Sequence, residues 1–153
     1  MKRLLRAGAV TGGLALAAAI GLAGATPAAA ASCSTNDACL WLYFNSENRG
    51  SSFLTTTSIS NLAGYKYTAP GAGQGQYVKN NAASASFRAD NNFYASSGTV
   101  FYRSGYGGPC DKLQGSENQI KWAPRLVRTY NENASVKIVS GLWGDHPSTC
   151  YNW

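Results

Sequence analysis

CLWLYFNSENRG, residues 39–50, decides the fold of this chain. Its first part, Leu40 to Phe44, is a short apolar and aromatic run bounded by Cys39 and by a cluster of turn-forming residues. This pattern predicts a strand that enters a hairpin, and FLTTT, residues 53–57, predicts the return strand. Gly50 follows Phe44 by six residues and suits a backbone with positive φ, which other residues resist.

The hairpin pattern occurs a second time near the middle of the chain. TVFYR (99–103) leads into SGYGG (104–108), so that Phe44 aligns with Tyr102 and Gly50 with Gly108 at an offset of 58 residues. NNAAS (80–84) aligns with NENAS (131–135) at an offset of 51. The two offsets differ by seven residues, which indicates a longer loop in the first half. We attribute the extra length to the glycine-rich segment 70–76, which cannot bury enough apolar area to order itself and should be an exposed loop.

The chain outside its first thirty residues favours β structure throughout. It is rich in Gly, Ser, Thr, Asn and Tyr and has few segments with helical periodicity, so strands and tight turns are expected. The two related halves, about 39–88 and 98–139, predict two four-stranded units that pack face to face as a sandwich.

Residues 1–31 have the layout of a cleavable secretion signal. Three basic residues precede an apolar run over 7–25, and small residues follow at 27–31. Glycines interrupt the run, which disfavours a spanning helix, and no cysteine ends it for a lipid to attach to. We expect cleavage after Ala30 or Ala31, an extracellular protein with no membrane association, one domain over 32–153, and a C-terminal tail at 140–153.

The charge of the mature chain is modest. Ten basic and seven acidic residues remain after cleavage, for a net charge of about +3. Spread along the chain, this charge is typical of an ordinary solvated surface, so no nucleic-acid partner is expected.

Four cysteines lie in the mature chain, and an even number in an oxidising compartment predicts two disulfides. Three pairings are possible. Cys33 and Cys39 flank five residues rich in turn formers, so a local bridge is easiest there and leaves Cys110 to pair with Cys150. A zinc site is the alternative, but the spacings suit no common zinc finger.

Several stretches together resemble a known family: residues 39–46 with Gly50, ISNLAGY (59–65), GAGQGQ (71–76) and VKNNAAS (78–84). They resemble secreted actinobacterial proteins classed with the Streptomyces metalloproteinase inhibitor, a family similar to the βγ-crystallins. The resemblance covers Cys33 to Val139. It implies an all-β, βγ-crystallin-like sandwich of two Greek-key motifs, which binds and occludes an extracellular peptidase. We expect a monomer.

Crystallin-type motifs often carry a calcium signature: two Asn or Asp, two variable residues, then Ser or Thr followed by Ser. Residues 80–85 depart from it at Ala85, and residues 131–136 depart at Glu132 and Val136. The side chains are mostly neutral, so any site would bind calcium weakly, and hydrogen bonding of a turn is the favoured role. No cofactor is therefore expected, and the candidate calcium ligands are Asn80, Ser84, Asn131 and Ser135.

The resemblance also implies an inhibitory loop that a short-range disulfide braces, because a loop held in its bound shape loses less entropy on docking. The Cys33–Cys39 bridge matches the family's first bridge. A second short bridge is missing, since Cys110 and Cys150 lie forty residues apart. The candidate for a presented loop is WGDHP (143–147), next to Cys150, with Trp143, Asp145 and His146 as its partner-binding residues.

The residues do not favour an enzyme. The chain has a single histidine, His146, its cysteines are expected to pair, and its acidic residues are scattered. Segment 71–76 lacks the Lys and Ser or Thr of a phosphate-binding loop. No catalytic residue is assigned.

The alternative function is a secreted binding or toxin-like module that acts on cell-wall polysaccharide or on competing microbes. Aromatic side chains that could stack on sugar rings suggest it. Filling of the core is the favoured role for Trp41 and Trp122, and residues 151–153 could equally close one end of the sandwich. The aromatic residues concerned are Trp122, Trp143, Tyr151 and Trp153.

Overall fold

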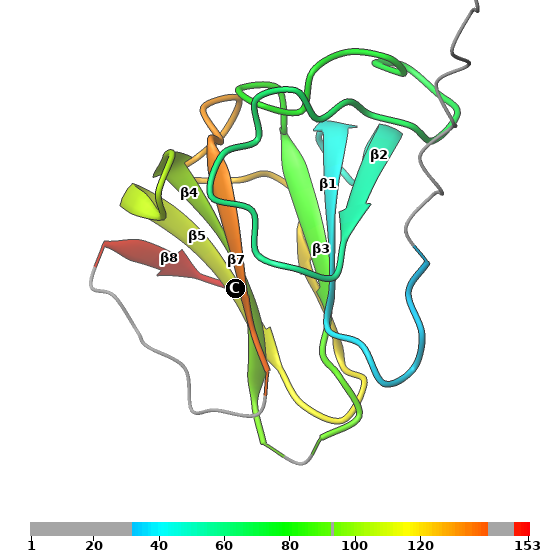
Figure 1. Ribbon diagram of the computed structural model, residues 1–153, viewed down its shortest axis with the longest axis vertical. Coiled ribbons are helices and arrows are strands. Elements are labelled where there is room, and N and C mark those ends of the chain that lie inside the picture. Colours follow the sequence, from blue (N-terminus) through cyan, green and yellow to red (C-terminus); the bar gives the residue numbers. More distant parts are fainter. Residues whose placement is uncertain (1–31, 93, 141–148) are drawn as a thin grey trace, which may run out of the picture.

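The computed structural model describes residues 32–92, 94–140 and 149–153, and the regular structure in these residues is β (Figure 1). The expected signal peptide, residues 1–31, lies outside them. No helix in this part of the chain is long and apolar enough to cross a membrane. The strands are β1 (Cys39–Asn45), β2 (Arg49–Thr55), β3 (Ser84–Arg88), β4 (Ser96–Arg103), β5 (Gly107–Gly115), β6 (Ile120–Ala123), β7 (Ser135–Val139) and β8 (Cys150–Asn152).

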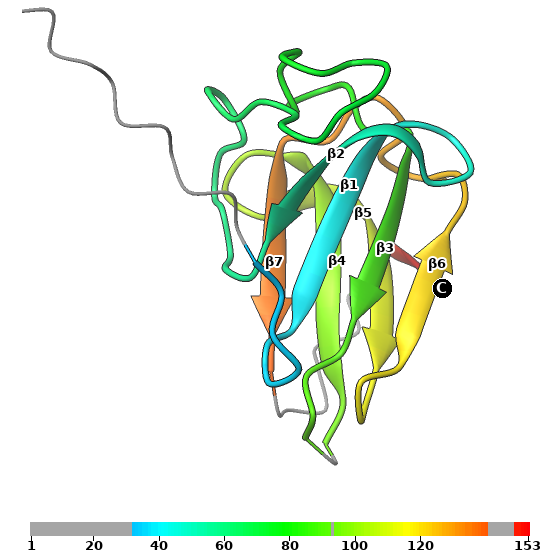
Figure 2. The same cartoon turned by 90° about the vertical axis from the view of Figure 1, so that its right-hand side faces the viewer.

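Two four-stranded sheets pack face to face (Figure 2). The first has the order β2-β1-β3-β6 and the second the order β7-β4-β5-β8. Strand β6, from the second half of the chain, pairs with β3, and Ile59, from the first half, forms a bridge with Val136 in β7. Each half thus gives one segment to the other's sheet. The predicted all-β sandwich of two Greek-key motifs is confirmed.

The core lies between the sheets and takes alternate residues from the strands. Leu40 and Leu42 of β1 are fully buried, as are Phe87 of β3, Val100 of β4 and Val136 of β7. Burying one such side chain contributes roughly 1.5–3 kcal/mol. Because successive strand residues point to opposite faces, this inward set fixes which residues of the first sheet face outward.

The two halves have equivalent hydrogen bonds in their hairpins. Ser84 Oγ donates to Asn45 O at 2.6 Å and accepts from Asn48 N at 3.0 Å, which ties the start of β3 to the β1–β2 turn. In the second half, Ser135 Oγ donates to Arg103 O at 2.7 Å and accepts from Tyr106 N at 3.0 Å. These bonds repeat at the same two offsets, 51 and 58 residues, as the sequence.

The glycine-rich segment 70–76 is mostly exposed, as expected, but it does not lack order. Ser51 N donates to Ala72 O at 2.8 Å. Gly73 has a φ of 89°, and a Cβ there would lie 2.2 Å from Phe44 Cγ. The expectation that this segment cannot order itself is therefore wrong, because backbone hydrogen bonds and a close approach to Phe44 replace the apolar burial that it lacks.

Two disulfides, Cys33–Cys39 and Cys110–Cys150, join the pairs that the sequence favoured. The second holds β8 beside β5, to which β8 pairs in parallel. Trp153, just after β8, donates its Nε1–H to Asp111 Oδ1 at 3.2 Å and packs against the core. Strand β8 is therefore the edge strand of the second sheet, and Trp153 fixes it to Asp111 and to the core.

Candidate binding surfaces

The four candidate calcium ligands lie in two equivalent turns. Asn80 and Asn131 both have positive φ, 60° and 54°, and their side chains are exposed. The Ser84 and Ser135 hydroxyls each make two hydrogen bonds within their hairpins. Two serine hydroxyls already engaged and two neutral amides fit a turn better than they fit an ion that prefers carboxylate oxygens. Weak calcium binding at these residues therefore stays a prediction.

The candidate presented loop lies outside the described residues. Trp143, Asp145 and His146 fall in the undescribed segment 141–148. Just after this segment the chain is held at two points: Cys110 N donates to Thr149 O at 3.3 Å, and Cys150 forms a disulfide with Cys110.

A groove of about 780 Å³ follows the outer edge of β2. Its apolar lining comes from Trp41 of β1, Phe53 of β2 and Tyr65, which follows β2 in the chain. The rings of Phe53 and Tyr65 meet edge to face, with centroids 5.5 Å apart. Lys66 is the one charged residue among those that line the groove. The groove is thus an apolar surface with a single positive charge on its rim.

We call residues 64–78 the rim loop, because its first arm, Gly64 to Lys66 and Thr68 to Pro70, lines the groove beside β2. The arms of this loop pair with each other: Val78 N donates to Tyr65 O at 2.9 Å, and Tyr67 N donates to Gln76 O at 3.0 Å. Between them, Lys66 and Tyr77 form an isolated antiparallel bridge. The loop is therefore a small hairpin rather than an irregular connection.

Tyr67 anchors the rim loop to the core. Its side chain is buried, its hydroxyl donates to Asn81 O at 2.9 Å, and its ring meets Phe44 edge-on with centroids 5.8 Å apart. Burial raises the pKa of the Tyr67 phenol, because the phenolate would lose its hydration.

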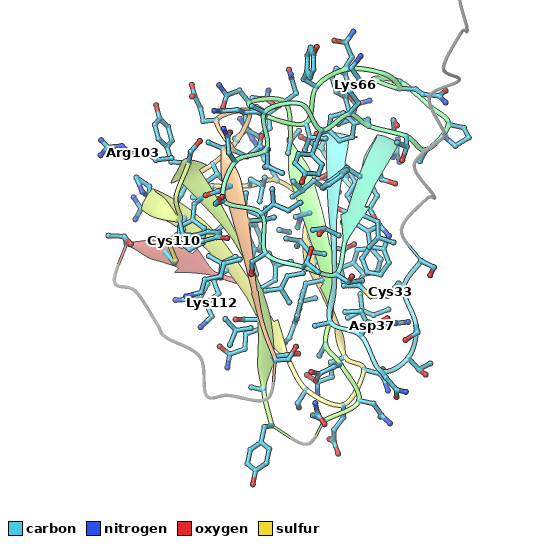
Figure 3. The ribbon with its side chains drawn as sticks, in the orientation of Figure 1. Cys33, Asp37, Lys66, Arg103, Cys110 and Lys112 are labelled. Carbon is cyan, nitrogen blue, oxygen red and sulfur yellow. A yellow bond between two sulfur atoms is a disulfide. The ribbon has the colours of Figure 1, made fainter. Side chains whose placement is uncertain are left out.

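The rim loop carries the exposed Lys66 and Tyr77 on one side, and the partly exposed Tyr65 lies on the other side, against Phe53. Tyr65 is 41% exposed and Tyr77 54% exposed. Lys66 Nζ lies 5.0 Å from the centroid of the Tyr77 ring, within range of a cation–π interaction. Figure 3 shows Lys66 at one end of the molecule, far from the Cys33–Cys39 disulfide.

The outer face of the first sheet carries a row of side chains that we call the aromatic row: Leu54, Trp41, Ser86 and Trp122. These residues pair directly across β2, β1, β3 and β6, so they share one face, onto which Figure 2 looks. Trp41 and Trp122 flank Ser86, with their Cα atoms about 10 Å apart. Beside the row, the Tyr43 hydroxyl lies 3.0 Å from Ser86 Oγ.

The expectation that Trp41 and Trp122 fill the core is wrong. Trp122 is 55% exposed, and Trp41 is half-buried and outside the core cluster. The physical reason is strand alternation: Leu40 and Leu42 turn inward, so Trp41 turns outward, and Ala123 turns inward, so Trp122 turns outward. Trp153 fixes the end of the chain to the core, as described above, and Tyr151 is exposed with its ring 5.0 Å from that of Trp153.

Sequence reasoning did not find the rim loop. It placed a loop at 70–76 but assigned no role to the tyrosines on either side. YKY (65–67) and QYV (76–78), which flank a glycine-rich stretch, were the signal available, since two alternating aromatic segments around glycines favour a hairpin.

Comparison with known proteins gives similarity in structure only. No protein-family model matches the sequence, and no curated protein matches it. The chain is similar to two solved βγ-crystallin domains. One is a βγ-crystallin from Ciona intestinalis, at 20% identity and a TM-score of 0.44, with 65% of this chain and 96% of that one covered. The other comes from work on the evolution of the eye lens βγ-crystallin domain fold, at 12% identity and a TM-score of 0.48, with 72% and 93% covered.

The architecture is βγ-crystallin-like. The paired Greek keys and the repeated hairpin bonds give this description for the chain itself. The finer resemblance to metalloproteinase inhibitors rests on the sequence alone.

Proposed function

We propose that this chain is a secreted inhibitor that binds an extracellular metalloproteinase and occludes it without chemistry of its own. The resemblance of residues 39–84 supports this proposal, and the two disulfides are consistent with an extracellular protein. The observation that carries it is the rim loop, a pinned hairpin that leaves Tyr65, Lys66 and Tyr77 accessible to a partner.

The rim loop meets the requirement that a braced loop serves in an inhibitor. Its arms are joined by backbone hydrogen bonds, its tip is bonded to β2 through Ser51 and Ala72, and its base is anchored by Tyr67. A segment already held in one shape loses less entropy when it docks. Tyrosine is also among the side chains that contribute most at protein interfaces.

The test is inhibition of a panel of secreted peptidases, including a thermolysin-like enzyme, by the oxidised mature protein. We expect inhibition of the metalloproteinase, and an inhibition constant at least tenfold higher for Tyr77→Ala. Tyr94→Ala is the matched control, because Tyr94 is 58% exposed but lies in the β3–β4 connection, at the opposite end of the sandwich (Figure 1). A folded protein that inhibits nothing, or equal losses for the two variants, would contradict the proposal.

The aromatic row favours a second candidate function, binding of uncharged polysaccharide. Its four side chains carry no charge, and exposed indole rings can stack on the apolar faces of sugar rings. We expect retention on insoluble cell-wall polysaccharide that Trp122→Ala weakens at least fivefold and Trp122→Phe weakens less. Tyr102→Ala, which removes an exposed ring from the second sheet, is the control. Retention that is unchanged in Trp122→Ala would exclude this role.

A further inference from the structure

The outer edges of β2 and β5 are equivalent positions in the two halves. Tyr43 pairs with Ser52 in the first hairpin, and 58 residues later Phe101 pairs with Cys110 in the second. Both hairpins also have a register shift at the same place, after Tyr43 and after Phe101. Residues of β2 can therefore be matched one by one with residues of β5.

The edge of β5 is covered by β8, whereas the edge of β2 is bonded to the rim loop at Ser51 and Ser52 and is open at Leu54. Strand β8 lies along β5 in parallel, in the register Cys110 with Cys150 to Lys112 with Asn152. In the described part of the chain, the first sheet ends at β2, and the groove runs where the counterpart of β8 would be. Figure 3 shows the two regions on different sides of the sandwich, with Cys110 and Lys112 on one and Lys66 above the other.

Backbone groups on the open edge point into the groove. Lys112 O accepts from Trp153 N at 3.0 Å, so Lys112 turns its backbone toward β8. Its counterpart, 58 residues earlier, is Leu54. On β1, Tyr43 O accepts from Ala83 N and so points toward β3, which leaves the opposite residue, Ser52, turned away from β1.

Leu54 follows Ser52 by two residues and therefore faces the same way. Ser52 O already accepts from Thr68 N and Ala69 N, both at 3.3 Å. For the N–H and C=O of Leu54, no backbone partner occurs among residues 32–92, 94–140 and 149–153. An open donor and acceptor on a sheet edge is a template for another strand.

The groove also restricts the chemistry of an occupant. Its aromatic residues suit apolar side chains on both sides of the edge, with Phe53 and Tyr65 on the side of the core and Trp41 on the outer face of the first sheet. Lys66, its one charged lining residue, is complementary to a carboxylate. Main-chain hydrogen bonds to an edge strand together with pockets for alternate side chains make a recurring mode of peptide recognition.

We propose that the open edge of β2 binds an extended peptide segment of another protein, one that carries an apolar side chain and a carboxylate. The segment adds a strand to the first sheet beside Leu54, as β8 adds one beside Lys112. This site goes beyond the proposed function, because it does not require the partner to be a peptidase.

The probe is a synthetic peptide with the sequence of residues 149–153 and serine in place of Cys150, with a free terminal carboxylate. This segment already fits an edge of the same geometry in the second half. Titrated into the ¹⁵N-labelled oxidised protein, it is expected to shift the amide resonance of Leu54 and those of its groove neighbours. The amidated peptide is expected to bind wild type at least threefold more weakly.

Two variants separate the backbone and charge contributions. Leu54→Pro removes the outward N–H, which an edge strand tolerates, and should weaken binding at least fivefold. Lys66→Gln should bind the free and the amidated peptide equally. Amide dispersion and thermal unfolding establish that both variants are folded.

The proposal is overturned if the folded protein shows no shifts at millimolar peptide, or if the shifts cluster away from β2. It is also overturned if Lys66→Gln still distinguishes the two peptides while Leu54→Pro binds normally. Shifts at Leu54 that depend on protein concentration without peptide would show that a second copy covers the edge instead, and would equally overturn it.

Discussion

Tyr67 should make the stability of the protein depend on pH in the alkaline range. Burial raises the pKa of its phenol above the ordinary value of 10.0, so the folded state keeps a proton that the unfolded state loses above about pH 10. The free energy of unfolding should therefore fall above pH 10, by about 1.4 kcal/mol per pH unit for this one group. Tyr67→Phe cannot lose that proton, so its stability should fall less steeply.

Urea unfolding of both proteins between pH 8 and pH 11 measures the two slopes. The variant should be less stable at pH 8, since it lacks the hydrogen bond to Asn81 O, and the gap should narrow as the pH rises. Parallel curves for the two proteins would contradict this account of Tyr67.

The side chain of Asp111 is buried and accepts five hydrogen bonds. Its buried carboxylate accepts from the backbone N–H groups of Val127, Arg128 and Thr129, each at 2.9 Å, from Thr129 Oγ1 at 2.8 Å, and from the Trp153 indole. Asp111→Asn would turn an amide NH₂ toward donors and leave some of them unsatisfied. We expect a loss of about 3 kcal/mol in the free energy of unfolding.

Chemical denaturation monitored by circular dichroism measures this loss. Glu117→Gln, at an exposed acidic residue, serves as the control and should change stability by less than about 0.5 kcal/mol. A loss below 1 kcal/mol for Asp111→Asn would show that the carboxylate is replaceable.

The roles of single residues were predictable only where a local rule decides them. Gly50 and Gly108 both have positive φ, 77° and 80°, as the hairpin pattern requires. Asp111 could not be recognised from the sequence, because its donors come from a segment 16 to 18 residues away and from the end of the chain. Trp41 was misjudged because a large indole was assumed to be core, although the leucines on either side of it already set the alternation.

At the scale of elements, the paired hairpins should respond alike to matched substitutions. Ser84 and Ser135 make the same two hydrogen bonds in the two halves, and both are fully buried. Replacing either by alanine leaves one carbonyl and one N–H without its partner, so each variant should lose about 1–3 kcal/mol. Thermal unfolding of the two variants checks this, and a silent substitution in one half would show that the halves are not equivalent.

The strands and hairpins that neighbours in sequence define were predictable, and so were the two offsets. The connections that cross between halves were not. The pairing of β6 with β3, the Ile59–Val136 bridge and the parallel strand β8 all depend on long-range packing, which no local pattern records. The rim loop was missed for a related reason, since its order comes from contacts with Phe44 and β2 rather than from its own composition.

At the scale of the whole molecule, the exchange of segments makes each sheet depend on both halves. The first sheet needs β6 from the second half, and β7 receives Ile59 from the first. One apolar cluster also takes residues from both sheets, among them Leu42, Phe87, Val100 and Val136. Neither half can therefore keep its buried surface if the other unfolds.

The oxidised protein should consequently unfold in a single cooperative transition. Far-UV circular dichroism follows all strands, whereas fluorescence of a variant that retains only Trp41 reports on the first half, and one that retains only Trp153 reports on the second. We expect the three transitions to coincide, and the calorimetric enthalpy to equal the van't Hoff enthalpy. Earlier loss of the Trp41 signal, with the Trp153 signal intact, would mean that the halves separate in spite of the exchange. Such a result would also show that the open edge of β2 belongs to the less stable half. A strand bound at that edge would then stabilise the sheet that it joins.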